Sequence, residues 1–342
     1  MTCSRITPEF GLQRIKICLK FIAVFFGFLL LANPLQAHHS RSAFDTASVI
    51  TYEGIVREVA WRSPHVYISI DLEDGGEWHF ESDSIPILIR SGWTDRSVVV
   101  GEHIVVEGNP GRKPSERASL LVSVLKDDGT VLTPRSHFQK DSRELQARSG
   151  ARSLAGVWEL PYGDYGDYFV SWGVVELTEA GASAQALFTP SALPTGTCIG
   201  TPTPMLLAMP YLSEIELQED IAYIRSEFFN TERIIYLDGR GHPENGVRTN
   251  QGHSIGRWEG EDLIIDTRLF EDHPAPMRST NEGVPSGAHK HVIERFSLSD
   301  DGSRVKIEVF LEDPEFLATP FQATLEWAYV ADFELSNYSC VP

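Results

Sequence analysis

The stretch Gln251-Gly-His-Ser-Ile-Gly-Arg-Trp-Glu-Gly-Glu-Asp-Leu-Ile-Ile-Asp-Thr267 decides the fold of the larger part of this chain. Two apolar runs flank the polar turn Glu259-Gly-Glu-Asp262, and this pattern is typical of a β-hairpin. A third run, His289-Lys-His-Val-Ile-Glu-Arg-Phe296, alternates in the same way and predicts another strand. Four of the chain's eleven histidines fall between Gln251 and Phe296, so we expect the functional site here.

Short strands are also predicted on both sides of this hairpin. Turns such as Asp238-Gly239 and Asp301-Gly302 separate them, which favours a closed or nearly closed antiparallel barrel over residues 153–342. The predicted strands are Ala184–Phe188, Ser213–Glu219, Ile221–Phe228, Thr231–Tyr236, Gly252–Trp258, Leu263–Thr267, His289–Leu298, Arg304–Leu311 and Ala323–Tyr329.

Residues 38–132 predict a smaller β domain. Five short strands are interrupted by one helix over Ser84–Gly92, with Ile85, Leu88 and Ile89 as its apolar face. This order is typical of a five-stranded barrel of the oligonucleotide/oligosaccharide-binding (OB) type. The polar segment 133–152 then predicts a linker. The expected fold class is therefore all-β, with a small OB-like barrel followed by a larger lipocalin-like barrel.

The small domain carries several separated motifs in order. They are His38-His-Ser40, Tyr52-Glu-Gly54, Trp61-Arg-Ser-Pro-His65, Arg90-Ser-Gly-Trp93 and Gly101. Together they resemble an exported bacterial domain family of unknown function, whose members begin with His-His-Ser after the signal and carry Trp-x-x-Pro-His. The resemblance implies export and a small β domain, and it implies no activity.

The second half carries another set of motifs. They are Tyr236-Leu-Asp-Gly-Arg-Gly-His-Pro243, Gly252–Gly260, Leu263–Thr267, His291–Phe296, Glu312-Asp-Pro314 and Thr319-Pro-Phe321. This half resembles uncharacterised exported bacterial proteins with a lipocalin-like barrel, and the resemblance again implies no reaction. The insertion-like segment Asn245–Asn250 departs from that pattern just before His253.

The first 37 residues have the pattern of a secretory signal. A positively charged region precedes the apolar run Phe21–Ala32, and Leu35-Gln-Ala37 is a small-residue cleavage site. The apolar run is shorter than the roughly 20 residues that a membrane span needs. We therefore expect a periplasmic or secreted protein without a membrane anchor.

Two cysteines, Cys198 and Cys340, remain after the expected cleavage. In an oxidising compartment, an even pair favours one disulfide, although two free thiols are the alternative. The net charge of -19 becomes about -22 when the signal's four basic residues and one acidic residue are lost. Because such a surface repels phosphate backbones, nucleic acid is excluded as a partner, and a small apolar or amphiphilic molecule is expected instead.

Acid–base chemistry on a small, mostly apolar ligand held in the mouth of the larger barrel is the leading functional hypothesis. An imidazole oriented by a carboxylate can transfer protons, and an arginine can steady a developing negative charge. The candidate catalytic residues are His253, His291, Asp266, Glu259 and Arg257. The candidate ligand-binding residues are Arg240, Trp258, Tyr236, His289 and Trp327. This hypothesis requires no cofactor and suits an isomerase, lyase or hydrolase.

Two alternatives stay open. His289 and His291, two residues apart on one strand face, present a pair of imidazoles to a metal, as does the set His38, His39 and His65. Copper or zinc would then be bound. The other alternative is a cell-envelope assembly module without catalysis, which would require an envelope protein as partner.

Other catalytic motifs are excluded. Gly252-His-Ser-Ile-Gly256 matches the letters of a nucleophile elbow, but neither a following helix nor a parallel sheet is predicted. No glycine-rich phosphate loop connects a strand to a helix either. The sequence therefore argues against an α/β-hydrolase and against a dinucleotide-binding enzyme.

Overall fold

The computed structural model describes residues 43–136, 150–161, 175–275, 277, 283–331 and 333–341. The expected signal peptide, His38 and His39 lie outside these residues, as does most of the expected linker. Within the described ranges, no helix is both long enough and apolar enough to cross a membrane.

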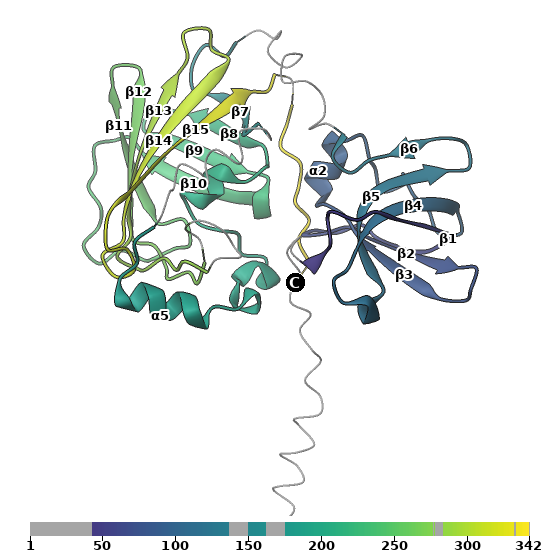
Figure 1. Ribbon diagram of the computed structural model, residues 1–342. Coiled ribbons are helices and arrows are strands. Elements are labelled where there is room, and N and C mark those ends of the chain that lie inside the picture. The colour runs from purple at the N-terminus through teal and green to yellow at the C-terminus, as the bar shows by residue number, and fades with distance from the viewer. Residues whose placement is uncertain are drawn as a thin grey trace, which may run out of the picture. The chain divides into compact units, whose positions relative to one another are not determined.

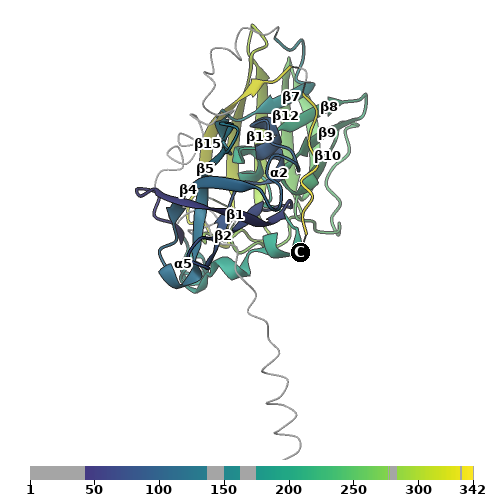
Figure 2. The same ribbon diagram turned by 90° about the vertical axis from the view of Figure 1, so that its right-hand side faces the viewer.

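The small barrel is formed by five strands, coloured purple to blue in Figure 1, with a short sixth strand beside them. Antiparallel pairing runs in the order β3, β2, β1, β4, β5, and a parallel pairing of β3 with β5 closes the ring. Figure 2 shows these strands from a second side. The strands are β1 (Ile50–Ala60), β2 (Tyr67–Leu72), β3 (Glu77–Glu81), β4 (His103–Pro110), β5 (Ala118–Lys126) and β6 (Val131–Leu132).

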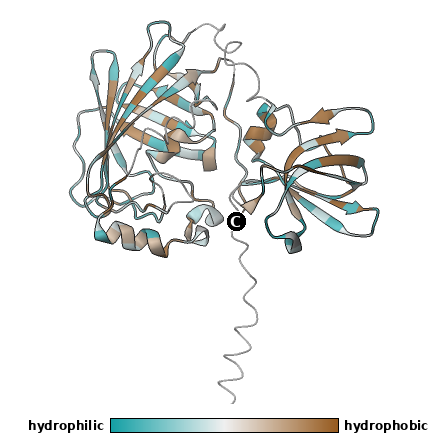
Figure 3. Cartoon of the chain, viewed as in Figure 1, coloured by the Kyte–Doolittle hydropathy of each residue, from teal (hydrophilic) through white to brown (hydrophobic). Residues whose placement is uncertain are grey.

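Helix α2 (Ile85–Arg90) lies between β3 and β4, where the sequence predicts it. Its short apolar run, brown in Figure 3, buries two faces rather than one. Leu88 packs in the core of the small barrel. Ile87 instead packs with Leu206 and with aromatic residues of the second half, among them Tyr211. Ile89, expected on the apolar face, is 44% exposed because the helix turns it away from both contacts.

The large barrel is a closed ring of nine strands, coloured teal to yellow in Figure 1. All neighbouring pairs are antiparallel except β10 and β11, which pair in parallel because the segment between them returns along the barrel. The strands are β7 (Gly156–Glu159), β8 (Ser213–Leu217), β9 (Ile221–Ser226), β10 (Thr231–Tyr236), β11 (His253–Glu259), β12 (Asp262–Arg268), β13 (His291–Leu298), β14 (Arg304–Glu312) and β15 (Phe321–Tyr329). These rings confirm the predicted all-β fold class, a small closed barrel of five strands followed by a larger closed barrel.

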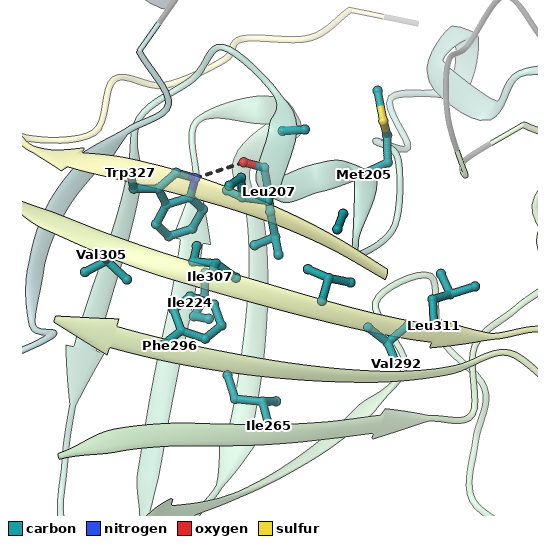
Figure 4. Packing of buried hydrophobic residues seen from close by; sticks show 14 of the residues in the cluster. Met205, Leu207, Ile224, Ile265, Val292, Phe296, Val305, Ile307, Leu311 and Trp327 are labelled. Atoms are coloured by element: carbon teal, nitrogen blue, oxygen red, sulfur yellow. Dashed lines mark hydrogen bonds between the residues drawn. The ribbon is translucent and has the colours of Figure 1, made fainter. Parts of the chain in front are cut away.

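The interior of the large barrel is filled with apolar side chains. Burial alternates along β13 and β14, so every second residue enters the core. The 3-10 helix η6 (Met205–Ala208) adds buried side chains, and the indole Nε1 of Trp327 donates a hydrogen bond of 2.9 Å to the Leu207 carbonyl (Figure 4). Trp327, a candidate ligand-binding residue, is therefore part of the packed core.

Two predicted strands differ from the structure. Ala184–Leu187 lies in helix α5 (Glu179–Leu187), and Phe188 is its C-cap. The helix forms because Thr178 caps its first turn through the Gly181 amide and its alanines favour a helix. The strand predicted from His289 begins at His291 instead. A turn precedes it, in which the Lys290 amide donates to the Gly287 carbonyl.

Shorter 3-10 helices complete the described chain. They are η2 (Pro114–Glu116), η4 (Pro190–Ala192), η5 (Pro194–Thr197) and η7 (Phe228–Asn230). Cys198 directly follows η5 and forms a disulfide with Cys340, with the two Cα atoms 5.8 Å apart. This confirms the predicted pairing. The bond closes a sequence separation of 142 residues, which restricts the unfolded chain.

Candidate functional site

A cluster of histidines around one aspartate lies on the outer wall of the large barrel. His253, Asp266 and His291 come from β11, β12 and β13, three neighbouring strands. The residue that follows each of them, Ser254, Thr267 or Val292, is buried in the interior, so these three side chains face outward. The sequence predicted that they meet inside a barrel mouth, and the strand register places them on the opposite face.

Hydrogen bonds join these residues to a fourth, His242, in the loop after β10. The Nε2 atoms of His242 and His291 both lie 3.0 Å from Oδ1 of Asp266. The Nδ1 atom of His242 is 2.9 Å from Nδ1 of His253. If His242 is neutral and donates its Nε2 proton to the carboxylate, its Nδ1 accepts from His253. The Nε2 atom of His253 then carries a lone pair.

The environment adjusts the charge of two of these groups. Burial alone raises the pKa of Asp266, but hydrogen bonds from His291 and His242 bring it down to about 2. Burial lowers the pKa of His253 below its ordinary value of 6.5, and the charge of Arg240 lowers it further. Near neutral pH, Asp266 is therefore ionised and His253 is a neutral base.

Further side chains hold the cluster at its two sides. Tyr236 stacks on the His253 ring with centroids 5.2 Å apart, and the Arg240 guanidinium carbon lies 4.0 Å from the Tyr236 ring centroid. At the other side, the Nδ1 atom of His291 lies 3.3 Å from the Arg268 guanidinium and 3.5 Å from a carboxylate oxygen of Glu312. Two predicted ligand-binding residues, Tyr236 and Arg240, thus border the cluster.

A shallow groove of about 410 Å³ lies on the same outer wall, over β13, β14 and β15. Ile293 lines the groove and is the direct cross-strand partner of Asp266 in β12. The groove therefore begins next to the histidine cluster. Its lining residues are Ile293, Arg295, Glu308, Val309, Phe310, Gln322, Ala323 and Thr324.

The remaining predicted site residues are not part of this cluster. Glu259 accepts hydrogen bonds from Arg257 at 2.8 Å and from Arg295 at 2.5 Å, at the hairpin end of β11. Trp258, in the same hairpin, is 45% exposed and does not fill the barrel. His289 lies exposed in the turn before β13, so it does not share a strand face with His291.

Metal ligation has no geometric support in the described part of the chain, where no three histidine, cysteine or carboxylate side chains are arranged to hold an ion. The Nδ1 atom of His65 lies 3.0 Å from the Ser82 carbonyl oxygen and 3.6 Å from a carboxylate oxygen of Glu81. His38 and His39 lie outside the described residues, so copper or zinc binding at the N-terminus stays a prediction.

The sequence did not single out His242 as a site residue. It lies outside the Gln251–Phe296 stretch, in a loop to which strand parity does not apply. The signal that could have found it is its place in the motif Tyr236–Pro243, close to the strand pair that carries the other histidines.

A buried ion pair that the sequence also missed lies on the inner face of the same strands. The Arg233 guanidinium donates to both carboxylate oxygens of Glu294, and to the hydroxyls of Ser254 at 2.9 Å and Thr267 at 2.6 Å. Arg233 and Glu294 are each no more than 2% exposed. Parity places Glu294 on the strand face opposite to His291, but it does not say which of the two faces turns inward.

One family model and a number of solved structures match parts of this chain. Residues 28–119 match a family described as "Family of unknown function (DUF6152)", which agrees with the resemblance of the N-terminal domain. No curated protein sequence matches the chain. Among solved structures, a single-substitution mutant of the fluorescent protein UnaG is similar. Its identity is 14% and its TM-score is 0.25, with 52% of this chain and 96% of that chain covered.

Proposed function

We propose that the large barrel binds a small apolar or amphiphilic molecule against its outer wall and transfers protons there without a metal. The observation that carries this proposal is the hydrogen-bonded series Asp266, His242, His253. The carboxylate orients the first ring, which orients the second, so that Nε2 of His253 serves as the base. His291 holds Asp266 from the other side.

The groove beside the cluster supports the assignment of the ligand. Ile293 and Phe310 are cross-strand partners on its floor and give an apolar surface, and Arg295 and Glu308 add one charge of each sign. An apolar molecule with a polar edge suits this lining better than a polyanion does, because the chain is strongly acidic. We also propose that the protein is exported to the periplasm or secreted, because disulfides form in oxidising compartments and this chain carries one.

The test uses 5-nitrobenzisoxazole, a small apolar compound whose ring opens to a coloured phenolate when a base removes a carbon-bound proton. We expect the protein to accelerate this reaction, and His253→Gln to lower kcat by about 100-fold or more, the scale of general-base catalysis. The rate should rise with pH with a midpoint below pH 6.5, because the pKa of His253 is lowered. Phe310→Glu should raise KM and leave kcat unchanged.

His289→Gln is the matched control, because this histidine is exposed in the turn before β13 and does not lie on a strand of the cluster. It should react like the unmodified protein. Equal rates for the His253→Gln variant and the unmodified protein would overturn the assignment of the base. A rate that disappears with a chelator and returns with zinc would replace the proposal by the metal alternative.

A further inference from the structure

A second cluster of titratable side chains lies at one edge of the large barrel. Lys290 precedes β13, Asp313 follows β14, and His273 lies beyond the end of β12. Because these strands are antiparallel neighbours, the end of β12, the start of β13 and the end of β14 share that edge. None of the three residues is more than 4% exposed. The cluster therefore belongs to the interior and is separate from the histidines of the outer wall.

Lys290 is a buried amine with little polar compensation. Its Nζ donates to the Thr203 carbonyl at 2.9 Å and lies 4.0 Å from the centroid of the Phe270 ring. In the described part of the chain, no carboxylate lies within ion-pair distance of it. Burial lowers the pKa of Lys290 to about 7 and the charge of Arg233 lowers it too, whereas Asp313 and Glu294 oppose the change. A large share of the amine is therefore neutral and nucleophilic near pH 7.

Three buried polar atoms near this amine have no hydrogen-bond partner among the described residues. They are Nε2 of His273, Oγ of Ser286 and Oδ1 of Asp313. The Ala275 amide donates to Nδ1 of His273 at 3.2 Å, so the ring proton lies on Nε2 and is available to an acceptor. Each unpaired buried group costs about 1–3 kcal/mol. A local group of three is therefore the kind of arrangement that a bound polar molecule completes.

The backbone brings these atoms together. His273 and Ser286 form an antiparallel bridge, with amide-to-carbonyl distances of 2.9 and 2.8 Å. The next amide, Gly287, donates to Oδ2 of Asp313 at 2.6 Å, and a side chain built on Gly287 would begin 3.1 Å from Oδ1 of Asp313. Burial lowers the pKa of His273 to about 4, and the charge of Lys290 adds to this. The charge of Lys290 therefore acts on both His273 and Asp313.

From this placement we infer that the interior cluster is a carbonyl-binding site, at which Lys290 condenses with a small aldehyde or ketone to an imine. His273 Nε2–H and the Ser286 hydroxyl donate to the carbonyl oxygen. The neutral amine adds to the carbonyl carbon, and the proton lost from nitrogen passes through Asp313 to the oxygen, giving a carbinolamine. The remaining proton on nitrogen then passes through Asp313 to the hydroxyl group, water leaves, and the carbon–nitrogen double bond forms. Hydrolysis reverses the sequence.

The test treats the folded chain with acetaldehyde and sodium cyanoborohydride at pH 7 and maps ethylated peptides by mass spectrometry. We expect Lys290 to be ethylated first, at least about 10-fold faster than the exposed Lys113 and Lys306, whose amines stay protonated at this pH. The Lys290 rate should be half-maximal near pH 7. Asp313→Asn should slow Lys290 ethylation and leave the two exposed lysines unchanged.

Lys290→Met is the matched variant, since it keeps the length of the side chain without the amine. It should lose the fast-labelling site, and its circular dichroism should match that of the unmodified protein. If that variant fails to fold, peptide mapping of the unmodified protein still decides. Lys290 that stays unmodified while Lys113 and Lys306 react would overturn the inference. So would modification of Lys290 only in the unfolded chain.

Discussion

Both faces of β11, β12 and β13 carry a group of hydrogen-bonded polar side chains, but the group on the inner face is buried and the group on the outer face is partly exposed. On the inner face, Ser254, Thr267 and Glu294 surround the Arg233 guanidinium and satisfy it. On the outer face, only one residue away along β11 and β12, His253 and Asp266 join His242 in a partly exposed cluster. A shift of one residue along a strand reverses the face and therefore the environment.

The difference in burial separates a structural ion pair from a candidate site. The inner pair has exchanged water for a full set of hydrogen bonds, so it stabilises one arrangement of the strands. The outer cluster keeps contact with solvent and leaves one nitrogen of His253 unused. Access combined with an unused lone pair favours the outer cluster as the place for proton transfer.

The largest expected effect is on the inner face. Glu294→Ala leaves the Arg233 guanidinium buried without its counter-charge, so we expect the free energy of unfolding to fall by about 3–5 kcal/mol. Urea denaturation followed by tryptophan fluorescence measures it. The double variant Arg233→Met with Glu294→Leu is the control and should lose far less, because no unpaired charge remains. A loss below about 1 kcal/mol for Glu294→Ala would contradict this account of the inner face.

An intermediate effect is expected from Lys290 and depends on pH. Because its folded-state pKa of about 7 is below its ordinary 10.5, the unfolded chain binds more protons between these values. Relative to Lys290→Met, the unmodified protein should therefore gain about 2 kcal/mol of unfolding free energy between pH 7 and pH 9. Parallel urea titrations at both pH values measure the difference. A difference that does not change with pH would show that the amine is solvated.

The smallest expected effect is on the outer wall. The folded-state pKa of Asp266 is about 2, below its ordinary 3.8, so its stabilisation is present above about pH 4 and is lost as pH falls through 2. Asp266→Asn should cost about 1 kcal/mol at pH 6, because solvent screens the cluster, and nothing near pH 2. Asp272→Asn, in an exposed loop, is the control. If Asp266→Asn lowered the free energy of unfolding as much as Glu294→Ala does, the proposed difference between the two faces would be wrong.

Much of the fold could be predicted from local pattern. Strands β10, β11, β12 and β14 lie within one residue of their predicted limits, because alternation and glycine turns are local signals. The pattern failed at Ala184–Phe188, where a cap and helix-forming residues prevail, and at His289, where a turn precedes the strand. The apolar interior was expected to hold a ligand, and the insertion of Met205–Ala208 fills it instead.

The candidate site was predicted only in part. The sequence identified His253, Asp266 and His291, because histidines and carboxylates gather in one stretch. It did not identify His242, Arg233, Lys290 or His273 as site residues, because loop positions and the identity of the inner face do not follow from spacing.

The sequence by itself determined the strands, the two cysteines that pair, and which side chains share a face along each strand. Those properties follow from a period of two and from residue chemistry, and they need no knowledge of neighbouring strands. Only the tertiary structure decided which face turns inward and which loop brings His242 to Asp266. Closing the barrel fixes the register of all nine strands at once, and that register gives each polar side chain either a buried partner or access to solvent.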